Sequence, residues 1–279
     1  MKSIVLRNGK NLAATGLMVL ATCAVLTPLG LIFLHIIKMG LSSLSLDFFT
    51  QIPKPTGESG GGMANGLFGS ALLILLSSCL GLPVGILGAV YLTEFGGDRL
   101  STTIRFSADV LAGIPSIITG MVAYTLIVVP MKGFSTLAGA VALALIMIPI
   151  VLRTTEEQLK MVPSTLREAS LALGVPLWRT SLKVMLKSAT KGVVTGILLA
   201  IARIAGETAP LLFTALGNQF WSRKLTEPIA ALPLQIFSFA IAPYEDWHKL
   251  AWAGALVLVV IMFTLNLGAR LLGRQKKYS

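Results

Sequence analysis

The sequence predicts an all-α membrane protein with six transmembrane helices. Hydrophobic residues make up 54% of its 279 residues and charged residues only 13%, a balance unlike that of soluble domains. Six apolar segments are each long enough to cross a hydrocarbon core, which takes about 20 residues of helix. The strands of a membrane β-barrel would instead alternate apolar and polar side chains. We therefore expect six membrane-spanning helices.

Polar or turn-rich connections separate the six segments. The segments are Leu12 to Ile37, Leu67 to Thr93, Ile104 to Val129, Phe134 to Leu152, Gly192 to Leu216 and Leu250 to Leu272. The first has no cleavage site of small residues and should remain as an anchor. We divide the chain into an anchor helix with a flexible Gly- and Pro-rich linker at 1–66, a five-helix core at 67–272, and a basic tail at 273–279.

The net charge of +11 is distributed unevenly between alternate connections. Sixteen Lys and Arg residues fall in the N-terminus, the connection between the second and third segments, the 153–191 loop and the C-terminus. Six fall in the other connections, and one, Arg203, lies near the middle of a segment. The positive-inside rule places both termini and the 153–191 loop in the cytoplasm. Because topology explains the basic excess, we predict no nucleic-acid partner.

Glycine and proline mark the second and third segments. Gly81, Gly85 and Gly88 suit close packing between helices in lipid. Pro115 interrupts the third segment, and such a break is tolerated where it is buried in protein or lines a wet cavity. A simple proline kink is the alternative.

The 153–191 loop has helix signals of its own. Thr154 followed by Glu157 has the spacing of a capping box, so a first short helix should begin there. Ser164 can cap a second helix, which Gly174 ends in a left-handed conformation. Pro176 suits the first turn of a third helix.

The fifth segment carries two charged residues, Arg203 and Glu207. One unpaired charge at the bilayer centre costs roughly 2.5 to 3.5 kcal/mol. Residues four apart share a helix face, so the two side chains can pair. Either the pair fixes helix register, or it forms a ligand or gate site in which Arg203 binds an oxyanion. We favour the second because ionisable residues inside a membrane are usually functional. Thr208 can donate a hydroxyl hydrogen bond nearby, and Pro210 should bend the helix.

The stretch from Glu168 to Gly174 resembles the EAA signature of bacterial ABC import permeases, with Glu168, Ala169, Ser170 and Gly174 at its marked positions. Lys187 stands where the signature has proline. The resemblance implies a type I ABC importer permease fold, in which this cytoplasmic coupling helix docks into an ATP-hydrolysing subunit.

A second resemblance narrows the substrate. The stretch Arg203 to Leu211, together with Gly113 to Ile117 and Tyr91 to Glu94, is similar to the phosphate-transport permeases of that family. The resemblance implies phosphate import through the inner membrane of a bacterium, and it covers residues 67–272. It also implies a second permease subunit, an ATPase dimer and a periplasmic phosphate-binding protein as partners, besides membrane lipid.

The sequence leaves some rival functions open. The chain lacks a phosphate-binding loop of the Gly-x-x-x-x-Gly-Lys type, so ATP should be hydrolysed by another subunit. We therefore expect no enzyme activity and no cofactor in this chain. Cys23 and Cys79 both fall inside segments, so we also expect no disulfide and no metal site. A permease for sulfate or molybdate is the nearest alternative, and a secondary transporter or channel that works without an ATPase is a more distant one.

Overall fold

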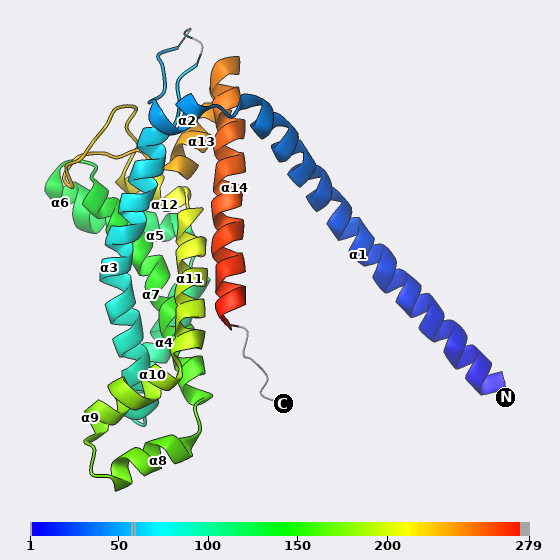
Figure 1. Cartoon of the computed structure of the whole chain (residues 1–279), viewed down its shortest axis with the longest axis vertical. Helices are drawn as coiled ribbons and strands as arrows, with labels where there is room; N and C mark the ends of the chain where they lie inside the picture. Colours follow the sequence, from blue (N-terminus) through cyan, green and yellow to red (C-terminus); the bar gives the residue numbers. More distant parts are fainter. Residues whose placement is uncertain (1, 57, 59, 274–279) are drawn as a thin grey trace.

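The computed structural model describes residues 2–56, 58 and 60–273, with side chains described from Lys10 onward except at residue 272. Regular structure in this part of the chain is helical apart from two isolated β-bridges (Figure 1). In chain order the elements are α1 (Lys2–Ser43), α2 (Leu46–Thr50), α3 (Ala64–Glu94), α4 (Arg99–Gly113), α5 (Ser116–Ala123), η1 (Tyr124–Val128), α6 (Val129–Met131), α7 (Thr136–Lys160), α8 (Ser164–Ala172), α9 (Leu177–Arg179), η2 (Thr180–Met185), α10 (Leu186–Ser188), α11 (Thr190–Ala205), α12 (Ala209–Thr214), α13 (Leu232–Ala240) and α14 (Glu245–Gly273). The segments η1 and η2 are π-helical. The predicted basic tail lies outside the described residues beyond Gly273.

Four helices are each long and apolar enough to cross a membrane, namely α1, α3, α7 and α14. Two further pairs meet that requirement only when each is taken as one bent span. The pair Arg99–Gly113 and Ser116–Met131 is bent by 108°, and the pair Leu177–Ser188 and Thr190–Ala205 by 74°. The all-α membrane class is confirmed, but the third predicted segment is not a straight helix. The 74° bend lies before the fifth predicted segment, which is itself interrupted between Ala205 and Ala209.

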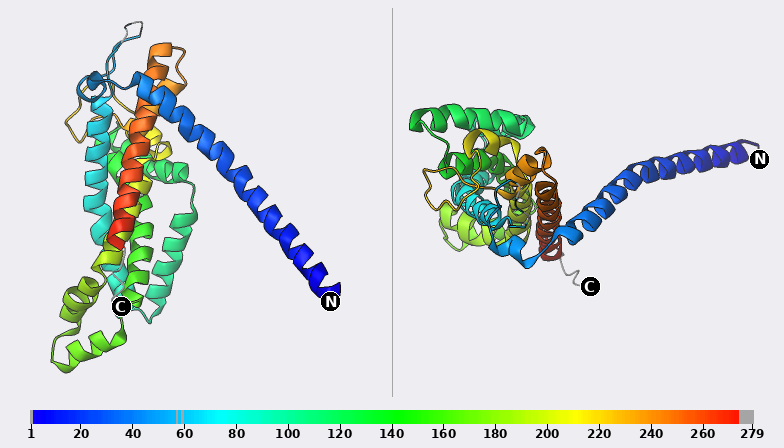
Figure 2. Two further views of the ribbon diagram at one scale, coloured as in Figure 1. Left: turned by 45° about the vertical axis from the view of Figure 1, so that its right-hand side comes forward. Right: turned by 90° about the horizontal axis from the view of Figure 1, so that it is seen from above.

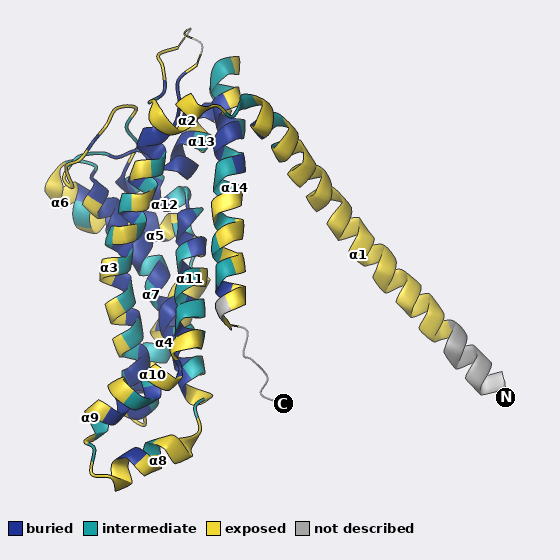
Figure 3. Ribbon diagram, in the orientation of Figure 1, coloured by how far each residue is buried: buried dark blue, intermediate teal, exposed yellow. Residues whose placement is uncertain are grey.

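The core of the molecule forms where α3, α7, α11 and α12 pack against one another (Figure 1). These helices contribute large apolar side chains that are almost fully buried, including Leu73, Leu143, Met147, Ile204 and Leu211. Figure 3 shows this buried centre and the exposed surface of α1 beside it. The many close contacts of these buried side chains hold together the helices that carry the candidate site.

Glycines set the separation of α3 from α7, as the sequence predicted. A Cβ atom added at Gly85 would lie 2.9 Å from the side chain of Val151, and one at Gly81 would lie 3.2 Å from the sulfur of Met147. Both distances are shorter than an ordinary van der Waals contact, so a larger residue would push the two helices apart. Only glycine lets these two helices approach so closely.

Helix α1 stands apart from the rest of the protein (Figures 1 and 2). It meets α14 near its C-terminal end, where a Cβ at Gly40 would lie 2.6 Å from Cβ of Leu256 and the rings of His35 and Trp252 are 4.9 Å apart. None of the residues in its apolar window is buried by the remainder of the described chain. This long apolar surface therefore needs lipid or a partner subunit to cover it.

Helices α8, α9 and α10 project from one end of the body, here called the α8 end (Figure 1). The predicted capping box before them is wrong. Thr154 lies inside α7, and its hydroxyl donates to the carbonyl of Ile150 at 2.8 Å. Because α7 is already helical there, the backbone donors that a cap would satisfy are bound to carbonyls of the preceding turn.

The two helices predicted further along the loop do form. α8 begins at Ser164, but Pro163 holds the capping position and no side chain caps the helix. Gly174 has a φ of +76°, which confirms the predicted left-handed stop. Pro176 takes the capping position directly before α9, one residue ahead of the first turn in which it was predicted.

A hydrogen-bonded amide network closes the opposite end of the body. Asn65 donates to the carbonyls of Asn218 and Gln219, at 3.0 Å each, and accepts a 3.1 Å bond from Gln235. This network connects the start of α3 to the loop before α13 and to α13 itself. The positions of α12 and α13 relative to α3 are thereby fixed.

Candidate functional site

The fifth span is interrupted where its two charged residues lie. α11 ends at Ala205, and α12 begins at Ala209. The sequence indicated a bend at Pro210, but this proline lies in the first turn of α12, where its missing N–H has no helical partner to lose. The interruption comes earlier, between Ala205 and Ala209, so Arg203 lies in the last turn of α11 and Glu207 lies within the interruption.

Arg203 and Glu207 form the predicted ion pair, between Nη1 of the arginine and Oε1 of the glutamate. The Glu207 side chain is 6% exposed, whereas that of Arg203 is 58% exposed. Oε1 of Glu207 is buried and has no well-aligned hydrogen-bond donor among the described residues, so charge attraction holds the pair. A guanidinium has five N–H donors. Most of those on Arg203 therefore remain free to bind an anion.

Thr208, the third predicted pathway residue, occupies the capping position of α12 and is half-buried. Its carbonyl accepts the amide hydrogens of Leu211 and Leu212 at 3.1 and 3.2 Å. Its hydroxyl makes no hydrogen bond to another described residue. Thr208 thus belongs to the interruption itself, next to the ion pair.

The interruptions of the third and fifth spans are joined in space. A Cβ added at Gly120 in α5 would lie 2.6 Å from Cα of Pro210 in α12. This contact brings together two motifs that are far apart in the sequence. Glycine is required at position 120 because the two backbones touch there.

The packing of α11 against α7 fixes the depth of Arg203. A Cβ at Gly196 would lie 2.5 Å from the hydroxyl oxygen of Thr154, and Gly192 faces Gln158 in the same antiparallel register. Arg203 is about two turns beyond Gly196, about 10 Å along the helix axis. The same rise along α7 leads from Thr154 to Met147, which belongs to one buried cluster with Ile204.

The interruption of the third span lies at a similar depth. Arg153 in α7 forms an ion pair with Asp109 in α4, which sets the register of these two helices. Gly113, at the end of α4, is one turn further along, about 6 Å. The same rise along α7, from Arg153, reaches Pro149. Pro149 is half a turn from Met147, the α7 residue at the level of Arg203. Both interruptions therefore lie near one level, and irregular backbone at such depth is typical of a substrate pathway.

The predicted coupling residues lie in α8 and in the turn that follows it. Glu168, Ala169 and Gly174 are exposed. Ser170 differs, because it is buried and its hydroxyl oxygen lies 2.9 Å from that of Thr180 in η2. Leu173 is 83% exposed. α8 therefore presents an apolar tip and one carboxylate outward, while Ser170 attaches it to η2.

Sequence reasoning missed a buried carboxylate near the α8 end. Glu156 in α7 has a side chain only 1% exposed and binds three cations. They are Arg105 Nε at 2.8 Å, Arg153 Nη1 at 3.2 Å and Lys160 Nζ at 2.7 Å. The basic residues were counted only as loop charges. Nothing in the local sequence signals that Arg105, 51 positions earlier, reaches Glu156.

A second ion pair at the same end was also missed. Arg167, which precedes the coupling residues, lies 3.2 Å from Oε2 of Glu94 at the end of α3. Nearby, Asp98 caps α4 by accepting from the amide and hydroxyl of Ser101 at 3.0 and 2.7 Å. These two bonds lower the pKa of Asp98 below its ordinary value.

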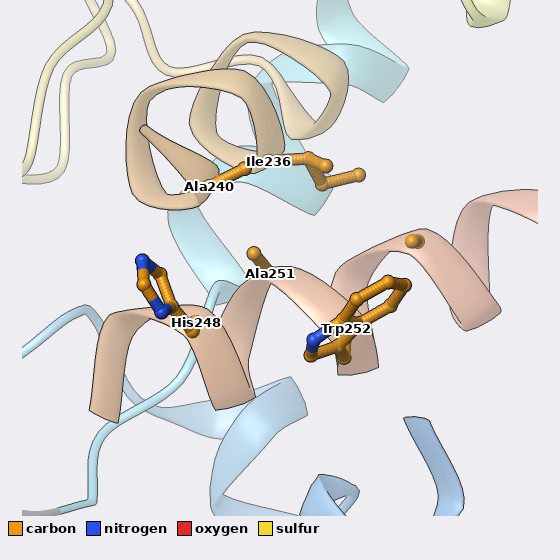
Figure 4. A pocket seen from close by; sticks show the side chains of 6 residues that line it. Ile236, Ala240, His248, Ala251 and Trp252 are labelled. Atoms are coloured by element: carbon orange, nitrogen blue, oxygen red, sulfur yellow. The ribbon is translucent and has the colours of Figure 1, made fainter. Parts of the chain in front are cut away.

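A separate cavity of about 230 Å³ lies between α13 and α14 (Figure 4). Its lining is mostly apolar, with Ile236, Ala251 and Trp252 among the side chains. Its one imidazole, His248, has Nε2 2.6 Å from the carbonyl oxygen of Ala242. This cavity suits an apolar group and is distinct from the Arg203 site.

Residues 81–278 match the family described as binding-protein-dependent transport system inner membrane component. The chain is 50% identical over 243 residues to the phosphate transport system permease protein PstA of Yersinia pestis, covering 87% of this chain and 82% of that protein. It is 46% identical to PstA of Pasteurella multocida, covering 88% of each.

Solved structures show the same fold at low identity. The inward-facing MetNI methionine ABC transporter matches with a TM-score of 0.59 and 20% identity, over 75% of this chain and 91% of that one. A bacterial ABC transporter for import of the acidic polysaccharide alginate matches with a TM-score of 0.57 and 12% identity, over 91% and 95%.

Proposed function

The chain belongs to the family of binding-protein-dependent transport inner membrane components, and we infer that it is a permease subunit of an ATP-driven importer of inorganic phosphate. Identity of 45–50% to PstA proteins, over most of both chains, is the observation that supports phosphate over sulfate or molybdate. Permease subunits of this class are not themselves enzymes. ATP would be hydrolysed by a separate subunit, as the lack of a phosphate-binding loop in the sequence also suggests.

Arg203, Glu207 and Thr208 form the proposed pathway site. Arg203 would attract the phosphate through N–H donors that the ion pair leaves free. Glu207 would hold the guanidinium in place and repel a bound phosphate enough to permit its release. Thr208 would donate its hydroxyl. The burial of Glu207 next to a half-exposed Arg203 supports this division of roles.

Glu168, Ala169, Ser170 and Gly174 form the proposed coupling site. The exposure of Glu168 and Ala169 supports docking on an ATPase. The small side chain of Ala169 lets another surface approach the helix closely, and Glu168 offers a carboxylate to it. Closure of the ATPases would displace α8 and, through the adjoining helices, switch the pathway from outward-open to inward-open. Ser170 would keep α8 attached to η2 during this movement.

An importer of this class works with an ATPase and a substrate-binding protein. We propose that the specific partners are a PstC-like second permease, a dimer of PstB-like ATPases and a PstS-like periplasmic phosphate-binding protein. The uncovered apolar surface of α1 supports contact with the second permease or with lipid. We infer no nucleic-acid partner and no cofactor.

The protein would lie in a bacterial inner membrane with both termini in the cytoplasm. The start of α1, the end of α14 and α8 all point toward the same end of the molecule, which supports that orientation (Figure 1). The separation of α1 from the body supports a division into an anchor with its linker at 1–66, a permease core at 67–272 and a tail at 273–279.

Reconstitution tests this function. The chain is purified with its co-expressed partners, placed in proteoliposomes with the binding protein, and supplied with labelled phosphate, sulfate or molybdate. We expect uptake of phosphate that depends on ATP and on the binding protein. Equal uptake of sulfate would contradict the substrate. Phosphate uptake driven by an ion gradient without the ATPase would contradict the transporter class.

A further inference from the structure

We propose that the ion pair between Glu94 and Arg167 is the mechanical link through which movement of α8 reaches α3. This inference rests on the proposed function, because it takes α8 to be the element that the ATPase moves. It assigns positioning roles to two residues outside both proposed sites. Arg167 directly precedes the exposed coupling residues, and Glu94 is the last residue of α3.

The contact has the geometry of a specific link. The Glu94 side chain is 1% exposed, and its Oε2 lies 3.2 Å from Nε of Arg167. Arg167 also donates through Nη2 to the backbone carbonyl of Glu94 at 3.4 Å. Two contacts from one guanidinium to one residue restrict rotation as well as separation. Oε2 of Glu94 is buried and accepts no aligned hydrogen bond from any described residue, Arg167 included. Charge attraction and the bond from Arg167 to the Glu94 carbonyl therefore hold the pair.

Two residues of α8 make polar side-chain contacts with other helices of the described chain. On its far side, the hydroxyl of Ser170 reaches Thr180 in η2, and η2 leads through α10 into α11. On its near side, Arg167 reaches α3. Displacement of α8 would thus be passed to α11 through a hydroxyl pair and to α3 through a charge pair.

The end of α3 is in turn held by the rest of the body. Arg105 in α4 donates through Nη2 to the carbonyl of Leu92 at 2.8 Å, while its Nε binds Glu156 in α7. The last turn of α3 is therefore bound by arginines from two directions. A pull on Glu94 would be transmitted to α4, the first half of the interrupted third span, as well as to α7.

The alternative is that the pair serves stability alone. A purely stabilising contact would change the amount of folded protein without changing how much phosphate moves for each ATP hydrolysed. A link would change that ratio. The two roles are therefore separated by measuring transport and hydrolysis on the same complex.

The test uses the full complex in proteoliposomes with saturating binding protein. Phosphate uptake and ATP hydrolysis are measured for Arg167→Gln, Glu94→Gln, the double variant and the conservative Arg167→Lys. Arg179→Gln is the matched control, because Arg179 lies in the same loop and is exposed beside Trp178.

We expect Arg167→Gln and Glu94→Gln each to lower the phosphate moved per ATP by at least about fivefold, the low end of typical coupling between sites. ATP hydrolysis should stay near the original rate. The double variant should lose no more than either single variant, because both remove one link. Arg167→Lys should retain most of the ratio, and Arg179→Gln should retain all of it.

Two results would overturn the proposal. In one, Arg167→Gln has the same ratio as Arg179→Gln; in the other, the double variant loses the product of the two single losses. If the unmodified complex itself fails to import phosphate with ATP, the proposed function fails instead. The unmodified arm of the experiment thus separates the two failures.

Discussion

Two buried carboxylates in this protein differ in the number of cations that they hold. Glu156, near the α8 end, binds Arg105, Arg153 and Lys160. Glu207, at the interruption of the fifth span, pairs with Arg203 alone among the described residues. The glutamates are equally hidden, with side chains 1% and 6% exposed.

The arginines around the two carboxylates show what this difference means. Those bound to Glu156 are 29% and 30% exposed, and each makes a further bond to a carboxylate or a carbonyl. Arg203 is 58% exposed and keeps most of its donors free. A carboxylate surrounded by cations holds helices together, whereas one cation with free donors is available to a transported anion. We therefore propose that the Glu156 cluster holds the helices together as a frame and that the Arg203 pair belongs to the pathway.

Removing the pathway cation gives the largest expected effect. Arg203→Gln should lower phosphate uptake by roughly 30-fold or more, because loss of a charged hydrogen-bonding partner costs about 2 kcal/mol or more. Uptake is measured in vesicles matched for the amount of the complex. Retention of uptake at matched levels would leave the pair only a role in helix register.

The variant Arg203→Gln leaves Glu207 buried without its cation, which can lower protein levels. The double variant Arg203→Gln with Glu207→Gln removes that penalty and serves as the control. It should restore the amount of complex in the membrane while uptake stays low.

The contact between Gly120 and Pro210, which joins the two interrupted spans, gives the next largest expected effect on uptake. Gly120→Ala places a Cβ 2.6 Å from Cα of Pro210, and overpacking of this kind costs about 1–3 kcal/mol. Uptake and the midpoint of thermal unfolding should both fall. Gly113→Ala is the control, since nothing lies within 4 Å of a Cβ there, and it should change uptake less than twofold. Equal effects of the two substitutions would mean that the contact between Gly120 and Pro210 is not needed for transport.

Glu156→Gln tests the frame. Breaking a buried ion pair costs about 3–5 kcal/mol, but the cations of Glu156 are 29–55% exposed, so screening should reduce the loss to about 1–2 kcal/mol. The unfolding midpoint of the purified protein should fall. The preference of uptake for phosphate over sulfate should not change, and a changed preference would move Glu156 into the pathway.

The smallest expected effect comes from the start of α7. The Ser135 hydroxyl accepts from the amide of Ala138 at 3.1 Å and caps that helix. Ser135→Ala should lower the free energy of unfolding by about 1 kcal/mol. Thermal unfolding in detergent measures the change. Reduced phosphate moved per ATP would show that α7 is not merely part of the frame.

Much of the fold could be predicted because its causes are local. The apolar runs gave the spans, Gly174 gave the end of α8, and Gly85 marked close packing against α7. The pairing of Arg203 with Glu207 was also predicted, from their four-residue spacing. The structure keeps the pair although α11 ends at Ala205 and Glu207 lies beyond the helix end.

The rest depends on contacts between distant parts of the chain. The capping box at Thr154 failed because the span before it continues as helix through that point. The ion pair of Glu94 with Arg167 joins residues 73 positions apart, so no local pattern reveals it. The contact between Gly120 and Pro210 likewise exists only once the two spans are packed together.

Thiol labelling tests the distinction between pathway and frame most directly. In a chain with Cys23 and Cys79 replaced by serine, single cysteines are placed by Thr208→Cys and by Thr155→Cys, next to Glu156, where the native side chain is fully buried. The rate of modification by a charged, water-soluble thiol reagent is measured on the complex during ATP turnover. We predict that Thr208→Cys reacts, that phosphate slows its reaction and sulfate does not, and that Thr155→Cys stays unreactive. A Thr208→Cys thiol that is inert, or whose rate ignores phosphate, would contradict the assignment of Arg203 to the pathway.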